Sequence, residues 1–172
     1  MSTRSERYWS IVDTAGAPAL DRGPRADVRS ANALVRELTP LLGGLPELRR
    51  DAAQALAHLW HDDLDAAHAL CQAHEGDPDN DYIHALLHRR EGDFANAKYW
   101  FAEVGAHPSY PAAASAAREL GLRELVSASG DWRPAAAVDA CRKALADYVH
   151  QAELVDVQAR EFHALADHLL AE

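Results

Sequence analysis

Apolar residues in this chain recur mostly at intervals of three and four positions, the spacing that lines one face of an α-helix. The clearest stripe is Phe94, Ala97, Phe101 and Val104, and we expect it to face the core. Few segments alternate strictly between apolar and polar residues or are rich in β-branched residues, so a sheet is not favoured. The pattern therefore predicts an all-α fold of roughly eight or nine helices.

Glycine, proline and acidic residues divide this pattern into segments. Asp27 is a candidate N-cap, and Pro40 with Gly43-Gly44 should stop the helix that follows it. Gly92 can close one helix in the left-handed conformation while Asp93 caps the next. We expect helices over residues 5–14, 27–39, 46–60, 63–74, 79–91, 93–104, 134–150 and 152–171, and one helix or two short ones over 112–127.

Two segments, 60–78 and 90–108, repeat one pattern at an offset of 30 residues. A fixed period of this size indicates stacked helical hairpins. Gly130-Asp-Trp132 echoes Gly92-Asp-Phe94 and suggests a third, degenerate repeat. The positions that match between the first two segments are Asp63 with Asp93, Leu64 with Phe94, Ala67 with Ala97 and Pro78 with Pro108.

The chain of 172 residues is long enough to bury one core, so we expect a single helical domain over 1–172. Residues 1–25 would form an N-terminal helix and linker, and 26–45 a packing helix. Residues 46–108 would hold two hairpins, and 109–172 a degenerate repeat with helices that cap the stack.

The net charge of −10 argues against nucleic-acid binding, which needs a basic face, and against docking on an anionic membrane. No apolar run approaches the length of a membrane span or a secretory leader. The two cysteines, Cys71 and Cys141, have no CxxC spacing, which predicts reduced thiols and a cytoplasmic location.

The second unit resembles the tetratricopeptide repeat, which has a small residue in its first helix, a Gly-Asp-aromatic turn and a closing proline. The resemblance implies antiparallel helical hairpins stacked in a superhelix, here with flanking packing helices. Both units depart from that family's 34-residue length, and in the first unit Asp62 replaces the turn glycine and Cys71 the aromatic. The block 84–108 also resembles uncharacterised bacterial and fungal proteins, which bring no activity to transfer. The residues that carry the repeat resemblance are Ala85, Gly92-Asp-Phe94, Ala97, Phe101 and Pro108.

The same resemblance implies a concave groove, lined by the first helix of each hairpin, that takes extended peptides. Guanidinium groups beside aromatics suit a carboxylate, so the expected partner is a protein or acidic peptide. The alternative is that the arginines pair with Asp81, Glu91 or Asp93 as solvated surface ions. The resemblance places Arg49, Ala52, Trp60, Tyr82, Leu86, Arg89 and Arg90 in the groove.

Seven of the ten histidines fall between positions 58 and 107. His84 and His88 lie four residues apart on one helix face that Glu91 extends, and His61 ends the preceding first helix of a hairpin. Together these four residues could hold zinc or iron, with hydrolysis as a potential activity, although the order is not HExxH and offers no obvious base. The alternative is that they are surface or hydrogen-bonded helix residues.

Phosphate loops, dinucleotide fingerprints and nucleophile elbows are missing from the sequence, so no catalytic residue is assigned. The leading hypothesis is a cytoplasmic peptide-binding scaffold without a cofactor, and the alternative is the histidine metal protein. A structural subunit that forms a homo-oligomer through an exposed stripe is the third interpretation.

Overall fold

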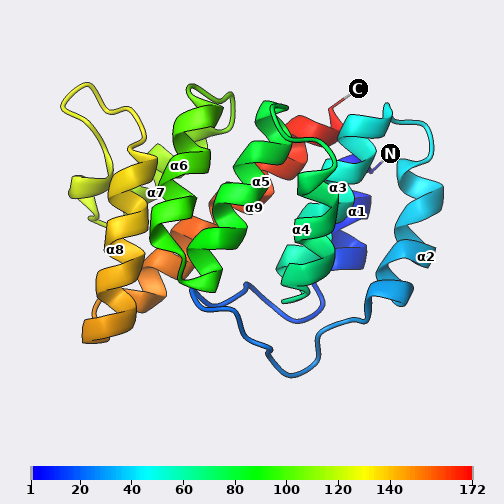
Figure 1. The fold of residues 1–172 in the computed structure, drawn as a ribbon, viewed down its shortest axis with the longest axis horizontal. Helices are drawn as coiled ribbons and strands as arrows, with labels where there is room; N and C mark the ends of the chain where they lie inside the picture. Colours follow the sequence, from blue (N-terminus) through cyan, green and yellow to red (C-terminus); the bar gives the residue numbers. More distant parts are fainter. Residues whose placement is uncertain (1, 172) are drawn as a thin grey trace.

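The structure, a computed structural model, describes residues 2–171. Over this range the chain forms nine α-helices and one short 3-10 helix, which confirms the all-α prediction. Most helices stand side by side in Figure 1, whereas the last one crosses behind them. The helices are α1 (Arg4–Val12), α2 (Ala31–Leu42), α3 (Glu47–Trp60), α4 (Leu64–Gln72), α5 (Pro78–Glu91), α6 (Phe94–Val104), α7 (Tyr110–Glu119), η1 (Arg123–Leu125), α8 (Pro134–Asp147) and α9 (Gln151–Leu170).

Helices α3–α4 and α5–α6 form two neighbouring hairpins (Figure 1). Ala85 and Ala97 are fully buried between α5 and α6, where their small side chains allow the backbones to approach closely. The turn joining these helices is as predicted: Gly92 has φ +85°, and the Asp93 carboxylate accepts a hydrogen bond from the backbone N–H of Asn96 at 3.1 Å. Helix α5 contacts α3, α4 and α6, and its residues 80–90 are all buried.

Asp62 occupies the turn position that glycine holds in the second hairpin. It adopts the left-handed conformation with φ +63°, which aspartate tolerates better than most residues with a Cβ. Its neighbour Asp63 caps α4 by accepting from the N–H of Ala66 at 3.1 Å. The first hairpin therefore makes the same kind of turn, but with a carboxylate side chain that can also form ion pairs.

Two predicted helix boundaries are wrong. Helix α2 begins at Ala31 after the N-cap Ser30, because Asp27 has φ +63° and precedes an extended segment. The same helix runs through Pro40 to Leu42, since a proline so near the C-terminal end removes only one intrahelical hydrogen bond.

Over 112–127, where the sequence predicted one helix or two short ones, the structure has two helical pieces. Helix α7 ends at Glu119, Gly121 follows with φ +80°, and only the three-residue η1 continues the helical turn. One isolated β-bridge joins Val126 to Trp132 beyond it.

Helix α9 packs against α1, α3, α7 and α8. Its apolar face includes Phe162, Leu165 and Leu169, each fully buried, but the polar Gln158 and Glu161 are buried with them. A buried carboxylate needs a charged partner and hydrogen bonds. Glu161 receives both from α5, through Arg89 and Tyr82.

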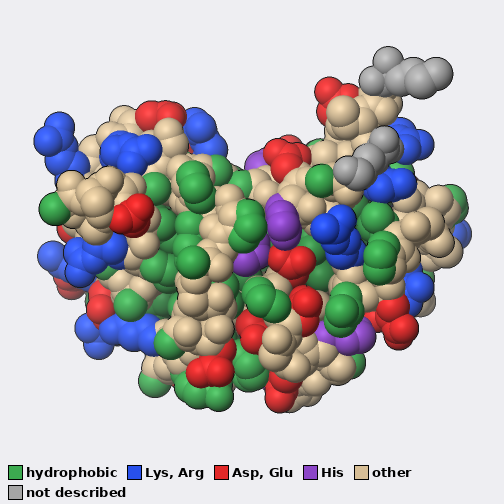
Figure 2. Space-filling view, turned by 90° about the horizontal axis from the view of Figure 1, so that it is seen from above, with side chains coloured by type: hydrophobic (Ala, Val, Ile, Leu, Met, Phe, Trp, Pro, Cys, Tyr) green, Lys and Arg blue, Asp and Glu red, His purple; other side chains and the backbone are tan. Residues whose placement is uncertain are grey.

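The surface mixes acidic and basic side chains, and no described helix combines the length and apolarity required to cross a membrane. Figure 2 shows lysine and arginine side chains gathered at the end where Figure 1 places α7 and α8.

We predict that Arg89→Met lowers the free energy of unfolding by about 3–5 kcal/mol, because it leaves the Glu161 carboxylate buried and uncompensated. The double variant Arg89→Met with Glu161→Leu should recover most of this loss. Denaturant unfolding measures both values. Arg160→Met, which breaks an exposed pair with Glu119, is the matched control and should cost less than about 1 kcal/mol. A loss of that small size for Arg89→Met would contradict the structural role of the buried pair.

Candidate metal centre

The predicted peptide groove is filled by the chain's own helix α9. The Trp60 ring packs edge-on against Phe162 of α9 with centroids 5.5 Å apart. The Tyr82 hydroxyl donates to Glu161 Oε1 at 3.0 Å, and Arg89 Nη2 donates to Glu161 Oε2 at 2.6 Å. Predicted groove residues thus touch an acidic helix that belongs to the same chain.

These side chains do not line an open groove, so the expectation of accessible anchors is wrong for most of them. The half-buried Arg49 alone stays partly accessible, and its Nη1 donates to the carbonyl of Ala171 at 3.4 Å. Burial alone would lower the pKa of Arg89, but the Glu161 carboxylate raises it above its ordinary range, so the guanidinium stays charged. The buried members are Ala52, Trp60, Tyr82, Leu86, Arg89 and Arg90.

Arg90 points the other way, toward the N-terminal linker. Its Nη2 donates to Asp62 Oδ1 at 2.6 Å, and its other nitrogens donate to the carbonyls of Leu59, Ala19 and Asp21. The backbone N–H and the Nε of Arg25 donate to the second oxygen of Asp62 at 2.8 and 3.0 Å. Burial raises the pKa of Asp62, but these hydrogen bonds outweigh it and hold the pKa below its ordinary value. Arg90 therefore fixes the linker and is not a binding residue.

His61 does not join the predicted metal ligands. Its Nε2 lies 2.8 Å from the carbonyl oxygen of Val12, and its Nδ1 accepts from the N–H of Arg29 at 3.0 Å. Both ring nitrogens are used, because a neutral imidazole has one donor and one acceptor. His61 instead connects the end of α3 to the N-terminal segment.

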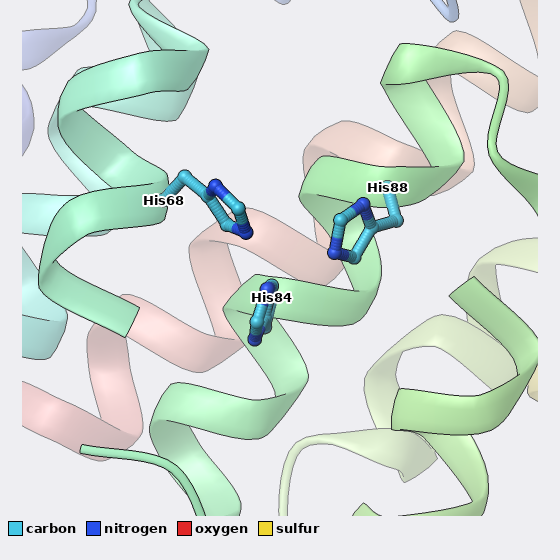
Figure 3. Close-up of side chains that lie close together, drawn as sticks. All are labelled: His68, His84 and His88. Carbon is cyan, nitrogen blue, oxygen red and sulfur yellow. The ribbon is translucent and has the colours of Figure 1, made fainter. Parts of the chain in front are cut away.

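The structure brings His84 and His88 of α5 together with His68 of α4 (Figure 3). One ring nitrogen from each residue lies within 4.8 Å of the others. Zinc binds imidazole nitrogen at about 2.0–2.1 Å, which places tetrahedral ligands roughly 3.4 Å apart. Side-chain rotations that move the nitrogens by about 1 Å or a little more would therefore close the three rings on one ion.

His84 is the most unusual member of this cluster. Its side chain is 2 % exposed, and neither ring nitrogen has a hydrogen-bond partner among the described residues. Trp100 of α6 stacks on the ring at a centroid distance of 4.2 Å. Burial, followed by the charges of His88 and His68, lowers the pKa of His84 from 6.5 to about 3. The imidazole is therefore neutral at ordinary pH, which is the form that binds metal.

Hydrogen bonds fix the orientation of the His88 ring, as they do for histidines that bind metals. Its Nδ1 lies 2.9 Å from Glu91 Oε2, and its Nε2 lies 3.0 Å from Asn96 Nδ2. The sequence predicted Glu91 as a ligand, but in the structure its carboxylate accepts a hydrogen bond from His88 Nδ1–H and orients that ring. This arrangement directs the Nε2 lone pair away from Glu91, as in many zinc sites. The Asn96 amide occupies that lone pair and must move when an ion binds.

In two other clusters of ligand-type residues, a central aspartate is already paired. In the first, Asp79 accepts from Nε2 of His107 at 2.9 Å and lies 3.1 Å from Nε2 of His168. His107 Nδ1 accepts from the N–H of Ser109 at 3.1 Å, so the proton sits on Nε2 and no lone pair remains for an ion. Figure 2 shows histidine and acidic side chains side by side midway along one face.

The second cluster joins Glu47, Asp51 and His74. His74 Nε2 lies 2.9 Å from one Asp51 oxygen, while Arg50 Nε donates to the other at 3.0 Å. The guanidinium group of Arg50 occupies one oxygen of Asp51, so it competes with any metal ion for this carboxylate. The cluster of His68, His84 and His88 is therefore the better metal centre.

His68 was not among the ligands predicted from the sequence. It lies 16 residues before His84, on another helix, and only the packing of α4 against α5 brings the rings together. The sequence signal that could have found it is its position five residues after the Asp63 cap, on the helix that precedes the one holding His84 and His88.

Three imidazole side chains define the chemistry available here. Imidazole nitrogen suits zinc, copper, nickel and iron(II), whereas calcium and magnesium prefer oxygen. Three protein ligands leave a fourth position for water in a tetrahedral site. His68 is half exposed, so this member of the cluster is accessible to solvent.

The chain was compared with protein families, curated proteins and solved structures. No family model matches it, and neither the curated proteins nor the solved structures contain a significant match.

Proposed function

We propose that this protein binds a divalent transition-metal ion, zinc in the first instance, through His68, His84 and His88. The observation that carries the proposal is His84, a buried neutral histidine whose two ring nitrogens have no hydrogen-bond partner among the described residues. An unmade hydrogen bond on a buried polar atom costs about 1–3 kcal/mol. Coordination of an ion would use one of these nitrogens and offset part of that cost.

The surroundings of the three rings support the same function. Glu91 orients His88, Trp100 holds the His84 ring by stacking, and both contacts reduce the freedom that binding would otherwise remove. The net charge of −10 attracts cations to the molecule. No carboxylate within the described cluster faces the ion as a base, so we propose metal binding and not hydrolysis.

Titration calorimetry of metal-free protein with Zn²⁺ should show one strong site per chain. His84→Phe, which keeps a ring stacked on Trp100, should weaken this site by more than about 100-fold, because losing an outer partner alone costs about 10- to 100-fold. The same variant should unfold with a free energy raised by about 1 kcal/mol, since two unsatisfied nitrogens are removed. His74→Ala, in the cluster with Glu47 and Asp51, is the control and should leave the strong site intact. Unchanged zinc affinity in His84→Phe would refute the proposal.

Asn96 and Glu91 should act in opposite directions on affinity. Asn96→Ala removes the amide that occupies His88 Nε2, so we expect tighter zinc binding, by a few-fold to about tenfold, the size of one hydrogen bond. Glu91→Gln should weaken binding by about 10- to 100-fold, because the amide orients the ring less strongly than a carboxylate.

The matched control for this pair is Asp93→Asn, which changes a neighbouring acid that caps α6, whereas the hydrogen bonds of His88 run to Glu91 and Asn96. Calorimetry measures all three variants. Equal effects of Glu91→Gln and Asp93→Asn would show that only the general charge near the site matters.

Metal-free protein should become less stable as the pH falls from about 6.5 toward 3, in part through His84. Its folded-state pKa of about 3 lies below the ordinary 6.5, so the unfolded chain binds a proton that the folded chain does not. His84→Phe should remove up to about 1.4 kcal/mol per pH unit of this slope. Denaturant unfolding at about pH 7 and about pH 5 gives both slopes, and identical slopes would contradict the prediction. His58, His61 and His163, whose pKa values are also lowered by burial, should keep a residual slope in the variant.

A further inference from the structure

In the joint between α8 and α9, two residues adopt a backbone conformation that their residue types disfavour. Tyr148 has φ +58° and His150 has φ +53°, both in the left-handed region, and neither is glycine or asparagine. Residues with a Cβ are disfavoured there. The Tyr148 side chain is 84 % exposed and Val149 is 41 % exposed, so packing compensates little. Strain of this kind is retained where an alternative conformation exists or the surroundings enforce it.

The residues across this joint have the sequence of an uninterrupted helix. Positions 144–154 read Ala-Leu-Ala-Asp-Tyr-Val-His-Gln-Ala-Glu-Leu, with no glycine or proline. Asp147 ends α8, where a negative charge opposes the helix dipole, whereas inside a longer helix that penalty disappears.

The inward stripes of α8 and α9 are also in register through the joint. Intervals of four and three alternate without a break, as in one continuous helix. Seven of the ten positions are buried; of the other three, Tyr148 lies in the joint and is exposed, whereas Gln151 and Val155 follow it and are half-buried. The stripe consists of Ala137, Cys141, Ala144, Tyr148, Gln151, Val155, Gln158, Phe162, Leu165 and Leu169.

The surface on which α9 packs, called its seat below, makes specific polar contacts with this helix. Every copy of the chain has this seat. Arg89 and Tyr82 meet Glu161, and Gln158 Nε2 donates to the carbonyl of Pro18 at 2.9 Å. A helix with the same apolar face and the same buried acid would fit this seat equally well. Helix α9 of a second copy has the same apolar face and the same acid, so it meets this requirement.

We propose that α9 exchanges between two copies of this chain to form a swapped dimer. The joint at 148–150 straightens, α8 and α9 merge into one helix over 134–170, and each α9 fills the other copy's seat. In the dimer, α9 makes all of its contacts with the other copy, and the left-handed residues become helical. The loss of entropy on association opposes dimerisation. Short strained hinges favour such exchange. The dimer therefore forms at high protein concentration, and the histidine cluster on α4 and α5 is retained in it.

A charge-reversal pair tests exchange directly. Arg89→Glu alone and Glu161→Arg alone each bury like charges and should not fold stably. In a swapped heterodimer, the seat of the Arg89→Glu chain receives α9 of the Glu161→Arg chain, and the unaltered seat receives the unaltered helix, so both buried pairs form. Refolding the two variants together should give a one-to-one dimer by light scattering, whereas each alone gives none. The double variant in one chain is the control for tolerance of the reversed pair. If that control folds but the mixture yields no dimer, the proposal is overturned.

Variants of the joint provide a test that does not depend on the buried pair. Tyr148→Gly with His150→Gly relieves the left-handed positions and weakens a continuous helix, so the dimerisation constant should fall by at least about tenfold. Tyr148→Ala with His150→Ala keeps the strain and favours the helix, so the dimer fraction should rise. Light scattering after refolding over a range of wild-type and variant concentrations measures both. Monomer at every concentration for all three proteins, or equal constants, would overturn the proposal.

Discussion

Two consecutive arginines in the last turn of the buried helix α5 determine how the rest of this chain is arranged. A guanidinium group stays charged in a protein interior, so each must meet a carboxylate and enough carbonyl oxygens to satisfy its donors. Arg89 and Arg90 point to different sides of α5, and each takes one end of the chain. Arg89 meets Glu161 of α9, whereas Arg90 meets Asp62 and the carbonyls of the linker after α1. Both ends of the chain are thus fastened to one helix by charge as well as by apolar contact.

The helical hairpins could be predicted from the sequence because their determinants are local. Gly92, Asp93 and the Phe94 stripe act within a few residues of their own positions, and the turn they specify is the one observed. The start of α2 was misplaced because Asp27 and Ser30 are both good N-caps, and only the path of the preceding linker decides between them.

The environment of Arg89 could not be predicted in the same way. Spacing along α5 shows which residues share a face, but not that α9 covers the face. Glu161 lies 72 positions away, and no local pattern marks the two as partners. His61 was misassigned for the same reason, since its partners Val12 and Arg29 come from distant parts of the N-terminal segment. His84 and His88 were found through their four-residue spacing, which is local, and His68 was missed because its approach depends on packing.

The position of α9 also affects how the chain folds during its synthesis. Helices α1 to α8 leave the ribosome first, so Arg89, Tyr82 and the apolar residues around them remain uncovered until α9 follows. A nascent chain in this state presents an unpaired charge inside an apolar depression, which is a surface that chaperones bind and that other nascent chains can enter. Completion of the core is therefore a late, long-range step, and its rate depends on how quickly α9 reaches its seat.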